Sequence, residues 1–158
     1  MATSMHRVRQ NFAYQLEQIA PTSTIVARGF LEVDTLRLDA QGNASGRARD
    51  FTIAWDSARG DLEPTDGYRR EAVHSYLLRV SYPTILGSEG DIMDAIAQDR
   101  HDAIERLRPQ TYYVGYSADA PTTDVGLMRR TRLRDYLIKE GPVWVHAYEF
   151  ECLVREAV

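Results

Sequence analysis

Two extended runs near the end of the chain decide the fold: LMRRTRLRDYLIK (residues 127–139) and VWVHAYEFECLVRE (residues 143–156), separated by EGP. In the second run, large apolar side chains alternate with polar ones, which is the period of a β-strand with one buried face. The residues that share this apolar face are Trp144, Tyr148, Phe150, Cys152 and Val154. Two such runs joined by a short segment with glycine and proline predict a β-hairpin.

The first run is notable for a group of arginines at Arg129, Arg130, Arg132 and Arg134. If the hairpin loop has an even number of residues, the last three of these share a face with Glu149 and Glu151. A two-residue loop places Arg134 opposite Glu149, whereas a four-residue loop places Arg132 there. Either loop predicts two cross-strand ion pairs, each contributing roughly 0.2–1 kcal/mol.

The arginines admit three interpretations: a solvated strand face with charge pairing, a subunit interface, or a contact with phosphate. A nucleic-acid contact would be expected to have further features beside it. The sequence has no glycine-rich phosphate loop, aromatic RNA-binding motif or zinc-finger spacing. The pattern therefore favours the charge-paired face first and the subunit interface second.

Upstream of the hairpin, HSYLLRVSY (residues 74–82) alternates as a strand, and Pro83 ends it. A helix is then predicted over residues 88–109, with Ser88 as its N-cap. Its apolar stripe consists of Ile92, Ile96, Ala103, Ile104 and Leu107. Asp99 and Asp102 are predicted on its charged side, where they keep the helix soluble rather than act as an acid–base pair.

In the N-terminal part, apolar residues recur at spacings of three and four, which predicts a helix over residues 4–20. The residues on this apolar stripe are Met5, Val8, Phe12, Leu16 and Ile19. Strands are expected at 24–33, 50–56 and 111–117. A hairpin loop or a projection is expected at 39–49, and a second loop at 57–68.

This order of elements predicts an α+β fold, a mostly antiparallel or mixed β-sheet with two α-helices packed on it and long loops. We expect one domain over residues 1–158, with a loop-rich stretch at 37–70 and the core sheet and helix at 71–158.

The composition limits the classes of protein to which the chain can belong. The chain has 158 residues, a formal net charge of -4 and one cysteine. That charge argues against a protein whose whole surface binds nucleic acid. One cysteine cannot form an internal disulfide, and no cysteine pair offers a zinc site. No segment reaches the length of a membrane span, which predicts a protein of the cytosol or of a particle assembled there.

Catalytic candidates are few. The histidines are His6, His74, His101 and His146, and none has a metal-binding helical spacing. His74 and His146 would meet only if their strands were neighbours in a suitable register. Cys152 alternates with apolar residues, which predicts a core thiol rather than a nucleophile. We therefore expect no catalytic, cofactor or metal site.

The arrangement of YLLRVSYP (76–83), DIMDAIAQDRHDAIERLRP (91–109) and VWVHAYEFECLVRE (143–156) resembles the tail terminator proteins of long-tailed phages and phage-like particles. The resemblance covers roughly residues 70–155. It implies a non-enzymatic virion protein of the tail, assembled in the host cytoplasm.

In that family the subunits form a hexameric ring on the head-proximal end of the tail tube. The implied partners are further copies of the chain, the tail tube protein and a head-completion or neck protein, with DNA only passing through. A ring contact is heterologous and needs two complementary faces. Candidates for them are Arg129, Arg130, Arg132, Arg134, Asp99 and Asp102. Alternatives are another neck or tail-completion protein, a small cytosolic α+β enzyme, or a nucleic-acid-binding module.

Overall fold

The computed structural model describes residues 4–21, 25–26, 28–39, 47–60, 69–107 and 125–157; the side chains of 4–8, 57–60, 69–72, 125–129, 131 and 154–157 are outside this description. The elements are α1 (Ser4–Glu17), β1 (Leu31–Glu32), β2 (Asp50–Gly60), β3 (Arg69–Pro83), the 3-10 helix η2 (Thr84–Leu86), α2 (Glu89–Arg106), β4 (Val125–Glu140) and β5 (Val143–Ala157). A five-stranded mixed sheet with two α-helices confirms the predicted α+β class.

The strand order in the sheet is β1-β2-β3-β5-β4. The β2–β3, β3–β5 and β5–β4 pairs are antiparallel, but β1 pairs parallel with β2. Of the two alternatives expected at 39–49, the hairpin loop is therefore wrong, and the projection concerns residues 40–46, which lie outside the described residues. The chain re-enters the sheet through a buried turn at Arg47–Asp50, where the Arg49 carbonyl accepts a hydrogen bond from Leu31 N at 3.2 Å.

Three other predictions concern a loop, a strand and the domain. β2 runs to Gly60, so residues 57–60 are strand and the loop predicted at 57–68 is wrong over those four positions. The strand predicted at 111–117 lies outside the described residues. The prediction of a single domain over 1–158 stays a prediction.

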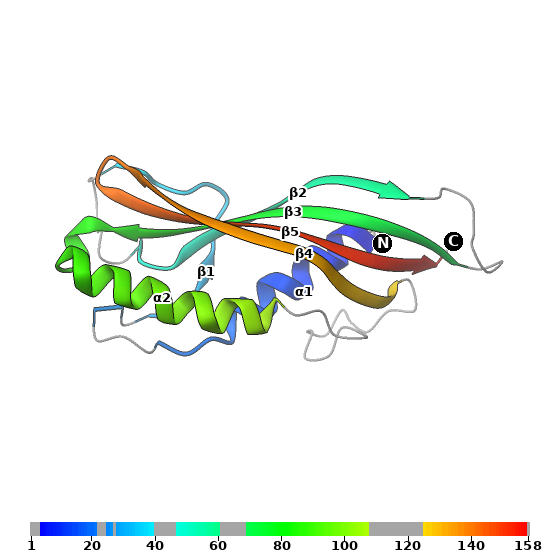
Figure 1. Ribbon diagram of the computed structural model, residues 1–158, viewed down its shortest axis with the longest axis horizontal. Coiled ribbons are helices and arrows are strands. Elements are labelled where there is room, and N and C mark those ends of the chain that lie inside the picture. Colours follow the sequence, from blue (N-terminus) through cyan, green and yellow to red (C-terminus); the bar gives the residue numbers. More distant parts are fainter. Residues whose placement is uncertain are drawn as a thin grey trace.

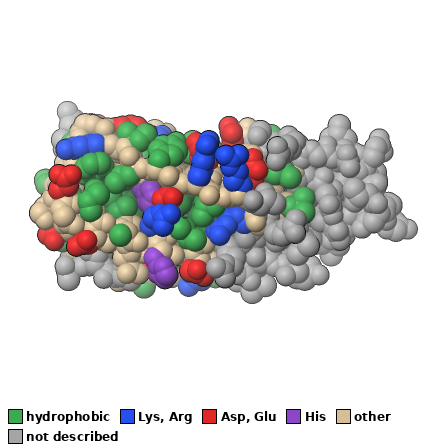
Figure 2. Space-filling view, in the orientation of Figure 1, with side chains coloured by type: hydrophobic (Ala, Val, Ile, Leu, Met, Phe, Trp, Pro, Cys, Tyr) green, Lys and Arg blue, Asp and Glu red, His purple; other side chains and the backbone are tan. Residues whose placement is uncertain are grey.

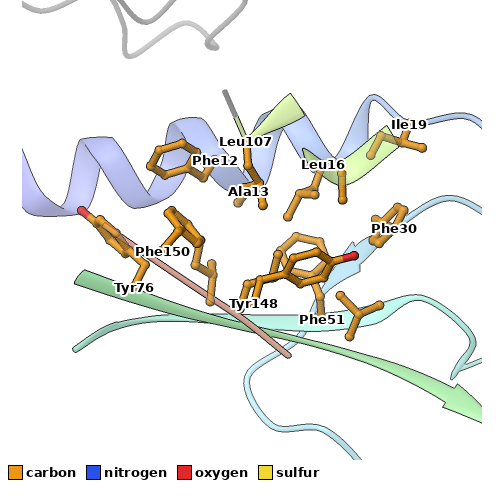
Figure 3. Close-up of a cluster of buried hydrophobic side chains, with 14 of the residues drawn as sticks. Phe12, Ala13, Leu16, Ile19, Phe30, Phe51, Tyr76, Leu107, Tyr148 and Phe150 are labelled. Atoms are coloured by element: carbon orange, nitrogen blue, oxygen red, sulfur yellow. The ribbon is translucent and has the colours of Figure 1, made fainter. Parts of the chain in front are cut away.

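Both helices lie on the same face of the sheet; in Figure 1, α2 runs below the strands, and α1 passes from below them to behind them. Phe12 of α1 is buried against Tyr76 of β3 and Phe150 of β5, and Leu16 lies further along the helix, over the part of the cluster that holds Tyr148 (Figure 3). Phe12 meets the two aromatic rings edge-on, with centroid distances of 5.8 Å to Tyr76 and 5.0 Å to Phe150. Full burial of each such side chain contributes roughly 1.5–3 kcal/mol, so this contact is a principal support of the fold.

The helix α2 begins as predicted. Ser88 Oγ accepts a hydrogen bond from Asp91 N at 3.2 Å, which satisfies one of the free amides of the first turn. Ile92, Ile96 and Ala103 are buried against the sheet. This confirms the predicted apolar stripe and fixes which side of α2 faces the core.

The opposite face of the sheet carries no helix among the described elements (Figure 1). At the hairpin end, Leu36 covers Val143 and Val145 there, with Val33 and Leu38 beside it. The segment after β1 therefore crosses to this second face and closes one end of it. We call the remainder, which runs over β2, β3, β5 and β4 toward the other end, the open face.

Candidate functional site: the open face of the sheet

The terminal hairpin has a two-residue loop, because β4 ends at Glu140 and β5 begins at Val143. Arg134 lies opposite Glu149 and Arg132 opposite Glu151, which is the register predicted for a two-residue loop. Arg134 Nε donates to Glu149 Oε2, so that predicted ion pair is confirmed. The arginine side chains at 132 and 134 are exposed on the open face.

Arg130 does not join them, and its predicted place in the row is wrong. A β-bulge between Arg130 and Arg132 shifts the register by one residue, so Arg130 lies opposite the buried Cys152. It points to the helix side, where Nη1 donates to the Ile104 carbonyl at 3.0 Å. Arg129 lies opposite Leu153 in the ladder, and its side chain is outside the described residues.

The two acids predicted on the surface of α2 differ. Asp99 is fully buried, so its predicted place on the charged side and at a subunit interface is wrong. It accepts hydrogen bonds from Arg49 Nε at 2.9 Å and from the Tyr82 hydroxyl at 2.8 Å. Asp102 does lie toward solvent, where Gln98 Nε2 donates to it at 3.3 Å.

A signal for the buried aspartate was present in the sequence. Asp99 lies three residues after Ile96 and four before Ala103, which puts it in the middle of the apolar stripe of α2. A charged residue at such a position implies a buried partner. No comparable signal pointed to Arg49, since it stands in a polar segment without apolar periodicity.

A groove of about 300 Å³ occupies the open face across four strands. Its charged and polar lining comprises Asp56, Ser75, Arg132, Arg134, Glu149 and Glu151. Two arginines and three acids give a net formal charge of −1, so the groove disfavours a phosphate ligand. Basic and acidic side chains lie next to one another over the middle of the molecule in Figure 2. Such alternating charge suits another protein surface.

On the helix side, a polar cluster that the sequence analysis missed joins three elements. Arg100 of α2 donates to both carboxylate oxygens of Asp135 on β4, at 2.6 and 3.0 Å. His146 Nε2 lies 2.8 Å from Asp135 Oδ2. The signal for it was Asp135 itself, which alternates with Leu133 and Leu137 on the helix-facing side of β4.

The charge states in this cluster follow from its geometry. The hydrogen bond from Arg100 lowers the pKa of Asp135 to about 2, and the one from His146 acts in the same direction. Burial lowers the pKa of His146, so the imidazole is neutral near pH 7. A carboxylate can only accept, so Nε2 carries the proton, and the buried Nδ1 has no hydrogen-bond partner among the described residues.

A histidine and an aspartate at this distance resemble the base of a hydrolase, but a nucleophile must be in reach of the imidazole. Nε2 is engaged by Asp135 and Nδ1 contacts no donor or acceptor among the described residues. His74 does not approach, because it pairs with Cys152 while His146 pairs with Val80. The cluster therefore ties β4 and β5 to α2.

Cys152 is completely buried, which confirms its predicted place in the core. Burial raises the pKa of its thiol to about 12, which leaves almost no thiolate near neutral pH. Within the described ranges, no three His, Cys, Asp or Glu side chains gather as metal ligands.

The described helices include none that is both long and apolar enough to span a bilayer. Comparison with known proteins adds no relative: no protein-family model matches the chain, and no curated protein is found to be similar.

Proposed function

We propose that this protein is a ring-forming structural subunit of a phage-like tail, a tail terminator that caps the head-proximal end of the tail tube and joins the tail to the head. Its partners are further copies of itself, the tail tube protein and a head-completion or neck protein. It resides in the virion tail after assembly in the host cytoplasm, and DNA only passes through the ring.

The observation that carries the assembly part of this proposal is the exposed strand β4. It has 16 residues and forms one edge of the sheet, where no other described strand pairs with its outer side. Arg132, Arg134, Tyr136 and Ile138 are all exposed on it. A long edge strand with unpaired backbone groups and exposed apolar side chains is a template for pairing with another chain. The tail location rests on the family resemblance of residues 76–83, 91–109 and 143–156.

The charge of the molecule supports the place given to DNA. The chain has a formal net charge of -4, and the groove on the open face has a net formal charge of −1 from its two arginines and three acids. Phosphate binding scales with the number of cationic contacts, so such a surface lets DNA slide past without retention.

Imaging and mass measurement of the purified chain test the proposal. We expect native mass spectrometry to give six copies and negative-stain images to show rings. When tail tubes of the same particle are added, we expect the rings at one end of each tube. A chain that stays monomeric both alone and with the tubes, and never appears at tube ends, would exclude a tail terminator.

A further inference from the structure

Both edges of the sheet carry large apolar side chains that the protomer leaves uncovered. On β4, Tyr136 is 41% exposed and Ile138 is 43% exposed. On β2, Trp55 is 40% exposed. Beyond Phe51, β2 is itself an edge, because β1 pairs only with Asp50 and Phe51. The described part of the chain thus has two open strand edges.

The strand directions make these two edges compatible. Along the row β2, β3, β5 and β4, every neighbouring pair is antiparallel, so β4 runs opposite to β2. When a second copy continues the sheet in the same orientation, its β2 lies next to the first copy's β4 and antiparallel to it. The alternation of strand direction then continues without interruption from copy to copy.

We infer that the ring is closed by pairing of β4 of one copy with β2 of the next copy, with Tyr136 opposite Ala54 and Arg134 opposite Asp56. This inference rests on the proposed function and supplies its subunit contact. The contact is heterologous, as a cyclic ring requires, because it joins two different edges of the same protein.

The side chains of the two edges fit each other in this register. Tyr136 and Ile138 lie on the open face, opposite Ala147 and Val145 of β5. The neighbour's Ala54 is small and exposed, and the bulky Tyr136 would pack over it. The exposed Asp56 brings a carboxylate to Arg134, and opposite charges across a ladder attract.

The end of β1 sets one limit of the pairing. Val33 N donates to the Phe51 carbonyl at 2.9 Å, so β1 occupies the β2 edge up to that residue. The next open-face position is Thr52, and the register places Ile138 opposite it. Moving the incoming strand two residues further toward β1 would bring Ile138 against Asp50, which β1 already pairs.

Pairing of β4 with a second β4 around a two-fold axis is the competing arrangement. It would cover Tyr136 and Ile138, but the β2 edge with Trp55 would stay exposed in every copy. Natural proteins protect long edges because exposed ones aggregate. Head-to-tail pairing uses both edges in one contact: Tyr136 and Ile138 pack on the open face, and Trp55, which is on the helix side of β2, comes opposite Asp135.

Cysteine cross-linking tests the register directly. Facing residues of an antiparallel pair have Cα atoms about 4.5–5.5 Å apart, within the reach of a disulfide, whereas diagonal neighbours at about 7–8 Å are beyond it. The native thiol, Cys152, is buried and does not compete. Ala54 and Tyr136 are exposed, so A54C and Y136C leave the core intact, which thermal melting of the reduced variants verifies.

On mild oxidation, the A54C/Y136C double variant should give a ladder of covalent oligomers on non-reducing gels. A mixture of the two single variants should stop at dimers. The A54C/I138C double variant is the matched control, two residues out of register, and should give less than a tenth of the cross-linked product. If the single variant Y136C is cross-linked to a covalent dimer, the copies pair through β4 around a two-fold axis, and the inferred contact is wrong.

The remaining outcomes separate the inference from the proposed function. If A54C/Y136C gives no product while images of the same sample show rings, the strand pairing is wrong and the ring proposal stands. A preferential product from A54C/I138C shows that the register is wrong. If neither product nor ring forms, with or without tail tubes, both proposals fall.

Discussion

Arg49 is the residue whose placement depends most on its surroundings. It is fully buried and has a φ of 66°, a left-handed conformation that is uncommon for residues other than glycine. Its guanidinium binds Asp99, donates from Nη1 to the Arg28 carbonyl at 3.0 Å and lies 5.1 Å from the centre of the Phe30 ring. One side chain thus joins the segment before β1 and the turn before β2 to α2.

Replacement of Asp99 by alanine should lower the free energy of unfolding by about 3–5 kcal/mol, because it leaves the Arg49 charge buried without its partner. Asp102→Ala, three residues along the same helix and near the surface, should change it by about 0.5 kcal/mol or less. Urea unfolding of the two variants beside the parent protein measures the difference. Equal effects would mean that the buried pair contributes no more than a surface acid.

Asp135→Asn tests the second polar cluster. The folded-state pKa of Asp135 is about 2, below its unfolded value of about 3.9, so its stabilising contribution is present above pH 4 and is lost as pH falls from 4 to 2. The asparagine variant should be less stable by roughly 1.5–3 kcal/mol at pH 7. Its stability should also fall less than that of the parent between pH 4 and 2. Urea unfolding at several pH values measures this. If the free energies of unfolding of the two proteins fell by the same amount between pH 4 and 2, the prediction would be wrong.

The terminal hairpin, by contrast, could be predicted as an element because several local signals agree. The alternation of β5, the Gly141–Pro142 pair and the positions of Glu149 and Glu151 all indicate the same pairing. The backbone at Gly141 has a φ of 60°, a conformation that favours glycine at the first position of a tight hairpin turn. The two-residue loop then selects one of the two registers that the sequence allowed.

Two glycine-to-alanine substitutions should act in opposite directions. Gly141→Ala forces a Cβ into the left-handed region and should destabilise the protein by about 1–2 kcal/mol. Gly90→Ala, in the first turn of α2, meets no atom within 4 Å and should stabilise it by up to about 1 kcal/mol. Chemical denaturation of both variants checks the sign. A Gly141→Ala variant as stable as the parent would show that the φ at Gly141 does not matter, and destabilisation by Gly90→Ala would contradict the gain expected in α2.

Other elements could not be predicted because distant partners decide them. β1 has two residues and pairs parallel with β2, and its position depends on the buried turn at Arg47–Asp50 rather than on its own periodicity. The bulges in β2 and β4 leave no mark in the alternation. Trp55 continues the apolar face of Phe51 and Ile53 in the sequence, yet it stays exposed at the sheet edge.

At the scale of the whole molecule, Arg132 and Arg134 are, among the described side chains, the arginines of β4 that are exposed on the open face, where we expect the subunit contact. The R132S/R134S double variant should weaken self-association by roughly 1.4- to 5-fold, since the inferred contact contains one exposed charge pair, Arg134 with Asp56, worth about 0.2–1 kcal/mol. R106S, which removes an exposed arginine of α2, is the control and should leave assembly unchanged. Sedimentation at several salt concentrations measures both. An unchanged oligomer in R132S/R134S would remove these arginines from the contact.

The bulge in β4 has a consequence for which changes in chain length the strand can accept. Thr131 is the extra residue, since Arg130 and Arg132 face consecutive residues of β5. Its deletion would leave every other residue of β4 on its present side of the sheet. Deletion of Leu133, only two positions away, would instead turn Arg132 into the helix-facing position opposite Phe150 that Leu133 now occupies. Related chains that differ in length within this strand should therefore have their gap at 131, and the Thr131 deletion variant should fold with the Arg130 contact to Ile104 intact.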